Sequence, residues 1–170
     1  MPILTLRALT TLSGAITGLM LILVGGMLPS AIFLPGNDLT PTILNLPSSW
    51  QIPAILICAI VCGPKSGIIA ASAYITIGLF FMPVFYNGGS LQYLIDPSFG
   101  YLIGFIPAAW LTGLLVTKYK DNKSIIKLTF AALLGLAIIQ SIGLISLTVG
   151  SLFHLWPTSL IELVYIYSLG

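Results

Sequence analysis

The feature that most constrains this chain is a series of long apolar runs separated by gaps that alternate in charge. One set of gaps holds every cationic side chain: Arg7, Lys65, Lys118, Lys120, Lys123 and Lys127. The alternate gaps hold Asp38, Asp96 and Glu162 and no Lys or Arg. The positive-inside rule predicts this segregation for a polytopic helical membrane protein. It also predicts a cytoplasmic N-terminus, with the segments after the first, third and fifth runs outside.

Composition supports a membrane protein and excludes an ordinary soluble domain. The 170 residues are 58% hydrophobic and only 6% charged, whereas soluble domains carry about 25% charged residues. The net charge of +2 is small, and the cations are spread along the chain instead of forming one basic patch. We therefore expect no nucleic-acid partner. The length predicts a single integral membrane domain over residues 1–170.

The apolar runs predict an all-α membrane helix bundle with five full transmembrane helices. The expected helices cover residues 8–28, 50–62, 67–82, 99–117 and 124–149. Residues 156–170 are too short to span and predict a short surface segment. The first run resembles a signal peptide, but its length and its ending Leu28-Pro29-Ser30 predict a retained helix. Residues 29–49 are expected to be a loop that turns at Pro35 to Asp38.

No constellation of catalytic residues is visible in the sequence. There is no G-x-x-x-x-G-K-[S/T] phosphate loop, and none of the five runs contains Asp or Glu. His154 is a lone histidine, and Cys58 and Cys62 lack the second ligand pair of a zinc site. We therefore expect no enzyme activity, no metal, no cofactor and no intramembrane proton relay.

The first run contains Gly14 and Gly18, four residues apart. Small residues at this spacing let two helices approach closely. Two interpretations stay open: the pair packs against other helices of this chain, or it docks a partner subunit.

Polar and aromatic candidates for binding a small molecule gather in the segments expected outside. They are Gln51, Tyr74, Asn87, Gln92, Tyr93 and Tyr101. A pocket of amides and phenols suits a mostly apolar molecule with a few hydrogen-bonding groups. The alternative is an aromatic belt at the membrane interface with ordinary loop polarity.

Four stretches resemble the BioY family, the biotin-specific substrate-binding (S) components of energy-coupling factor (ECF) transporters. They are LPSSWQ at 46–51, CGPKSG at 62–67, IGLFFMPVF at 77–85 and DPSFGYLIGF at 96–105. The resemblance covers most of residues 46–117. It implies six helices, a ligand pocket near the outer face and a ligand contact at Asn87. It further implies a bacterial cell-membrane location and docking of the first helix on a transmembrane coupling subunit through Gly14 and Gly18. ATP hydrolysis would belong to separate ATPase subunits.

The C-terminus departs from the family pattern. The family closes with a P-G-[D/Q]-L-x-K-like stretch, whereas residues 157–162 read PTSLIE and lack the Gly, the acid and the Lys. Alternatively, residues 160–169 correspond to the surface segment before a sixth helix. In either case the expected basic partner for a ligand carboxylate is missing. The predicted function is a subunit for uptake of biotin or a related small molecule. The alternative is a transport-incompetent structural or assembly subunit of a larger membrane complex.

Overall fold

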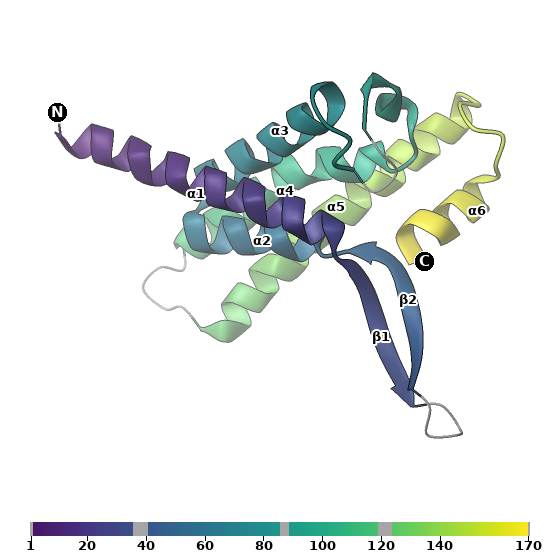
Figure 1. Ribbon diagram of the computed structural model, residues 1–170, viewed down its shortest axis with the longest axis horizontal. Coiled ribbons are helices and arrows are strands. Elements are labelled where there is room, and N and C mark those ends of the chain that lie inside the picture. The colour runs from purple at the N-terminus through teal and green to yellow at the C-terminus, as the bar shows by residue number, and fades with distance from the viewer. Residues whose placement is uncertain (1, 36–40, 86–88, 119–123, 170) are drawn as a thin grey trace.

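The protein is a bundle of helices from which a β-hairpin projects (Figure 1). The computed structural model describes residues 2–35, 41–85, 89–118 and 124–169. The main helices are α1 (Pro2–Met27), α2 (Gln51–Cys62), α3 (Pro64–Phe80), α4 (Phe99–Lys118) and α5 (Ile125–Leu152). The shorter elements are the 3-10 helix η1 (Leu91–Ile95), the helix α6 (Leu160–Val164) and the π-helical turn η2 (Tyr165–Leu169). The predicted helix bundle is confirmed, with helix ends that differ by a few residues.

Within the described residues, three helical segments are long and apolar enough to cross a membrane. They are Thr5–Met27, Phe99–Lys118 and Ile125–Leu152. Helix α2 is apolar but has only 12 residues, and α3 has 17, so both are shorter than the ~20 residues that a span requires. Many large apolar side chains point away from the bundle, among them Leu9, Phe80 and Ile145. A lipid environment would cover such surfaces.

Residues 29–35 and 41–49 correct one prediction, because they form two paired strands and not a loop. Residues 36–38 of the predicted turn lie outside the described residues. Strand β1 (Pro29–Pro35) pairs antiparallel with β2 (Pro41–Ser49). The sequence obscures this hairpin because prolines interrupt it and cannot donate to a ladder. The strand register accommodates the prolines. Pro35 pairs with Pro41 at the end of the ladder, and the ladder shifts so that Pro47 and Ser48 have no partner across from them. Such an irregularity is a common way to place proline in a strand.

Successive helices run in opposite directions, so the segments that carry the cationic side chains lie at the same end of the bundle. Arg7 lies near the start of α1, Lys65 in the first turn of α3, Lys118 at the end of α4 and Lys127 at the start of α5. Figure 1 shows these ends together, opposite the β-hairpin. We call them the cationic end and the hairpin end. Between α2 and α3, Gly63 has φ 86°, a conformation that glycine adopts readily, and Pro64 then opens α3.

Small side chains let the central helices approach closely. Ala59, Ala70 and Ala108 are fully buried, and a Cβ added at Gly67 would lie 3.1 Å from the Cβ of Ala109. Such close packing is typical of membrane helices, in which bulk hydrophobicity does not drive association. Polar bridges reinforce it, since the Thr112 hydroxyl of α4 donates to the carbonyl of Ala131 in α5 at 3.3 Å. The result is a rigid scaffold below the loops of the hairpin end.

Candidate ligand-binding site

A buried chain of hydrogen bonds links α2, α3 and the segment after α3. Gln51, the first residue of α2, donates from Nε2 to the Tyr74 hydroxyl at 2.8 Å. The Tyr74 hydroxyl in turn donates to the carbonyl of Val84 at 3.1 Å. Tyr74 is fully buried and Gln51 is nearly so. The Tyr74 hydroxyl therefore both donates and accepts a hydrogen bond, as expected for a buried polar group. These hydrogen bonds fix the start of the segment after α3.

Three aromatic rings, beginning with Tyr74, extend this series of hydrogen-bonded groups toward the hairpin end. Tyr74 and Phe85 meet edge to face with ring centroids 5.4 Å apart, and Phe85 and Tyr93 lie 4.6 Å apart with a 40° tilt. Phe85 fits because the position beneath it is Gly78, where an added Cβ would collide with its ring. The ring contacts therefore fix the position of η1 relative to α3.

Tyr93 ends the ring series in a polar cluster at the start of α4. Its hydroxyl lies 2.6 Å from the Ser98 hydroxyl, which also hydrogen-bonds Oδ1 of Asp96. The Ser98 amide donates to the same Oδ1 at 2.9 Å. Because Ser98 has one hydroxyl hydrogen and a carboxylate only accepts, Tyr93 is the donor to Ser98. Burial raises the pKa of Tyr93, opposed by the hydrogen bond to Ser98 and assisted by the charge of Asp96. Tyr93 therefore stays a neutral phenol at physiological pH.

A cleft of about 570 Å³ opens beside this cluster at the hairpin end. It is lined by Pro83, Gly89, Ser90, Gln92, Tyr93, Ile95, Asp96, Pro97 and Trp156. Trp156, from the segment after α5, closes one side, because its Nε1 donates to the carbonyl of Ile95 at 2.7 Å. The volume is within the range of small-molecule sites, about 300–1,000 Å³. We call this space the cleft.

Backbone strain marks the same cleft. Ser90 has φ 150°, a region that residues other than glycine adopt at a cost of about 1–3 kcal/mol. Its hydroxyl accepts a hydrogen bond from the Gln92 amide at 3.3 Å and caps η1. Strained residues concentrate at functional sites, so Ser90 adds an independent reason to consider the cleft.

The structure brings together some of the predicted residues and separates others. Gln92 and Tyr93 line the cleft, whereas Gln51 and Tyr74 lie beneath it and reach it only through the ring series. Asn87 lies outside the described residues. Sequence reasoning placed Asp96 in an outer segment without naming it as a binding residue, and it missed Trp156. Asp96 precedes a helix start, which was a usable signal, but Trp156 is 61 residues away from its partner Ile95.

Tyr101 lies apart from the cleft, on α4 facing α5. Its ring covers Gly143, where an added Cβ would collide with it. Its hydroxyl is buried and makes no hydrogen bond within the described residues. The nearby Ser168 hydroxyl donates to Oε1 of Gln140 instead, at 3.2 Å. An unpaired buried hydroxyl is uncommon, so Tyr101 has capacity for a further hydrogen bond.

Gly14 and Gly18 lie on the face of α1 that contacts this chain's own helices. A Cβ added at Gly14 would be 2.9 Å from the Cβ of Cys62 and from the hydroxyl oxygen of Ser66, and one at Gly18 would meet Cys58. The Ser66 hydroxyl of α3 also donates to the carbonyl of Thr11 at 3.1 Å. The geometry therefore supports the internal-packing alternative for these glycines, not the docking of a partner.

A second hollow of about 590 Å³ lies between α2 and α5. Its lining is mostly aliphatic, with Leu56, Ile60, Leu133 and Leu136 as typical members, and its side chains with polar atoms are Trp50, Thr129 and Gln140. We call it the groove. It offers few directed hydrogen bonds and faces the apolar flank of the bundle, so it suits hydrocarbon better than a polar solute.

Taken together, the fold is a polytopic membrane helix bundle that holds a polar cleft at one end. A sequence model of the BioY family matches residues 6–169, and the chain belongs to the BioY family. It is 34% identical over 100 residues to a "Probable biotin transporter BioY" of Lysinibacillus sphaericus, covering 58% of this chain and 50% of that protein. It is 32% identical over 115 residues to the "Biotin transporter BioY" of Thermotoga maritima, covering 67% of this chain and 66% of that protein. The matches thus span between half and two thirds of these relatives.

The structural comparison extends over more of the chain. A 2.1 Å crystal structure of the S-component for biotin from an ECF-type ABC transporter aligns with a TM-score of 0.66 and 28% identity. The alignment covers 94% of this chain and 82% of the other. The likeness therefore extends over most of the chain.

Proposed function

We propose that this protein is the substrate-binding membrane subunit for uptake of biotin or a related small molecule. The observation that carries the proposal is the structural likeness to a biotin S-component over 94% of the chain. The cleft supports it, because a phenol, an amide, an indole and a carboxylate surround a space of suitable size. Such a lining suits a largely apolar molecule with a few hydrogen-bonding groups.

Within this proposal, Gln92 and Tyr93 contact the ligand directly, together with Asn87. Gln51 and Tyr74 act as positioning residues, since their hydrogen bonds hold the segment after α3. Tyr101 is a further candidate because its buried hydroxyl lacks a partner within the described residues.

The proposal also includes membrane topology and partners. Helices α1 to α5 cross a bacterial cell membrane as one domain, with the cationic end and the N-terminus in the cytoplasm. A transmembrane coupling subunit and ATPase subunits supply the energy, so this chain is not itself an enzyme. The coupling subunit would meet the free face of α1, where Leu9, Leu12, Ile16 and Met20 are exposed and recur at helical spacing.

Equilibrium binding of labelled biotin to the purified protein in detergent tests the proposal. We expect saturable binding at one site, lost in Tyr93→Ala and retained in Phe153→Ala, which removes an exposed aromatic ring at the same end. Absence of saturable binding up to high micromolar biotin would reject the ligand. Co-purification with a complex lacking ATPase subunits would then favour the structural or assembly role.

A further inference from the structure

The short helix η1 forms one wall of the cleft and presents a different surface on each of its three sides. A 3-10 helix has three residues per turn, so side chains three apart share a side. Gln92 and Ile95 share the side that lines the cleft, and Tyr93 is buried in the bundle. Leu91 and Leu94 share the third side, where both are exposed and neither lines the cleft. The third side of η1 is therefore apolar and exposed.

The end of α3 continues this exposed surface. Phe80, Phe81 and Met82 are each more than half exposed. The backbone before η1 lies directly against this end, because a Cβ added at Gly89 would be 2.7 Å from Cα of Pro83 and 2.9 Å from the carbonyl oxygen of Met82. We call the joint surface the apolar rim, and its members are Phe80, Phe81, Met82, Leu91 and Leu94.

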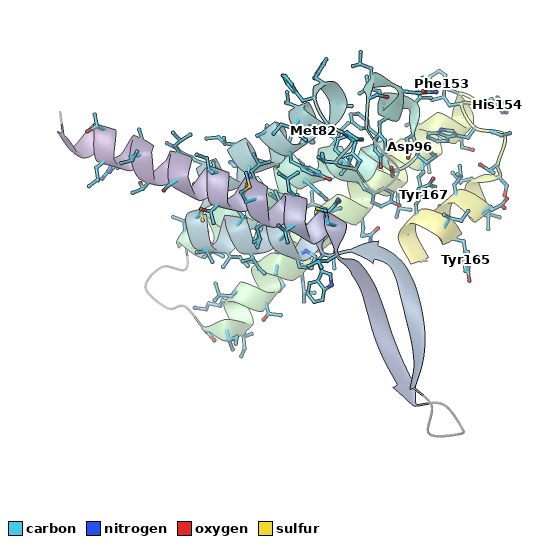
Figure 2. All side chains as sticks on the ribbon, in the orientation of Figure 1. Met82, Asp96, Phe153, His154, Tyr165 and Tyr167 are labelled. Carbon is cyan, nitrogen blue, oxygen red and sulfur yellow. The ribbon has the colours of Figure 1, made fainter. Side chains whose placement is uncertain are left out.

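The apolar rim carries no charge. Residues 79–95 contain no Asp, Glu, Lys or Arg, although this segment connects two helices. Figure 2 shows Met82 and Asp96 at the same end of the bundle, and Asp96 is the first charged residue that follows the rim in the sequence. Exposed apolar patches of this kind mark surfaces that bind another molecule or a membrane.

The lengths of α3 and α4 place the rim at the edge of a bilayer. Lys65 opens α3 and Lys118 ends α4, so both helices extend from the cationic end. Their 17 and 20 residues correspond to about 26 and 30 Å at 1.5 Å per residue. The hydrocarbon core of a bilayer is ~30 Å thick. With the two lysines at one boundary, the end of α3 lies inside the core, and the start of α4, which η1 precedes, lies at the other boundary.

The flank of the bundle below the rim faces in the same direction. Eleven residues separate Ile69 from Phe80 on α3, which is about three helical turns, and both side chains are exposed. They therefore lie on one side of α3, and no charged residue stands between them in the sequence. In a membrane protein such a flank contacts acyl chains, and the rim continues it. Phospholipid is thus the partner whose chemistry fits the rim.

We propose that the apolar rim binds phospholipid at the level where headgroups meet acyl chains, so that the cleft opens at the membrane interface and not into bulk water. The wall of the cleft formed by η1 is then held by lipid on one side and by the buried Tyr93 ring on the other. This inference concerns a surface outside the lining of the cleft, apart from the question of which ligand the cleft takes.

Fluorescence quenching in phosphatidylcholine vesicles tests this placement. The reporter is an environment-sensitive dye on Leu94→Cys, and the matched control carries it on Thr158→Cys, an exposed position in the polar turn before α6. Both proteins also carry Cys58→Ala and Cys62→Ala, which remove the native thiols. Apolar side chains of interfacial helices lie about 5–10 Å into the boundary of headgroups and acyl chains, so a nitroxide near the headgroup end of a lipid acyl chain should quench the dye at Leu94 about threefold more strongly than the dye at Thr158. Aqueous iodide should quench the two dyes in the opposite order.

Equal quenching of the two dyes by either agent would overturn the inference. The unmodified protein provides a second measurement if the cysteine-free variants do not fold. Phosphatidylcholine with a diazirine near the headgroup end of its acyl chain is photolysed in the same vesicles, and the label is located by mass spectrometry. We expect it on residues 80–82 and 91–94. Lipid label on other parts of the bundle with none on these residues would likewise overturn the inference. Either result leaves the proposed function standing, because that function is tested by biotin binding.

Discussion

The cleft and the groove are nearly equal in size, about 570 and 590 Å³, yet their chemistry is opposite. The cleft is built from loops at the hairpin end and presents Gln92, Tyr93, Asp96 and Trp156. The groove is built from helix faces and presents mainly aliphatic side chains. The comparison teaches that volume alone does not identify a site in a membrane protein. Directed polar groups on a rigid support do, and only the cleft of these two hollows has them in number.

The largest effect is expected from Tyr93→Ala. This change removes a buried ring that contacts Phe85 and a hydroxyl that bonds Ser98. Truncating a buried aromatic side chain costs about 3–5 kcal/mol, and here the loss falls on the wall of the cleft. Biotin affinity should drop by more than about 100-fold in equilibrium binding.

The matched change in the groove is Leu136→Ala, which should alter biotin affinity by less than about threefold. Equal losses of biotin affinity in Tyr93→Ala and Leu136→Ala would show that the cleft matters no more for binding than the groove does. Thermal unfolding of both variants in detergent shows whether each still folds.

Gly78→Ala should have the next largest effect. A Cβ at this position collides with the ring of Phe85, so the ring must move away from Tyr93 and the cleft wall shifts. We expect about a tenfold loss of biotin affinity, since overpacking costs about 1–3 kcal/mol. Thr76→Ala, an exposed change on the same helix, should leave affinity unchanged. Wild-type affinity in Gly78→Ala would mean that the ring series does not support the site.

Gln51→Leu should have a smaller effect of the same kind. It removes the hydrogen bond to Tyr74 but leaves the bond from Tyr74 to Val84. One hydrogen bond contributes about 1 kcal/mol, so biotin affinity should fall roughly fivefold. A loss as large as that of Tyr93→Ala would instead place Gln51 in direct contact with the ligand.

The pH dependence of stability tests the environment of Tyr93. Burial raises its pKa above the usual value of about 10, so the unfolded chain loses this proton first as the pH increases. The contribution of Tyr93 to stability should therefore be constant below pH 10 and should diminish above it. Thermal unfolding of wild type and Tyr93→Phe from pH 7 to pH 11 measures the difference. A difference that changes below pH 8, or stays constant to pH 11, would contradict this environment.

The smallest effect is expected from filling the groove. Leu133→Trp adds a large ring at an exposed position that lines the groove between α2 and α5. Biotin affinity should stay within about twofold of wild type, as measured by equilibrium binding. A tenfold loss would show that the groove takes part in binding, and the account based on the cleft would need revision.

Local signals in the sequence predicted the helices and part of the site. The apolar runs located α1 to α5 within a few residues, and the polar residues flanking them included Gln92 and Tyr93. The hairpin was missed because Pro35, Pro41 and Pro47 conceal its strand pattern, and only the register shows how they are accommodated.

The assembly of the cleft could not be predicted, because its parts come from distant segments. Trp156 and Ile95 are 61 residues apart, and no periodicity or motif links them. Likewise, only the packing of α1 on α2 and α3 distinguishes between the two interpretations of Gly14 and Gly18.

Photo-crosslinking with a diazirine attached to biotin through an amide tests most directly whether the cleft is the ligand site. We expect the label, competed by excess biotin, on peptides from residues 89–97, most of which line the cleft, or on Trp156. Competed label on residues 52–60 or 129–140, which line the groove, with none on the cleft would contradict this account.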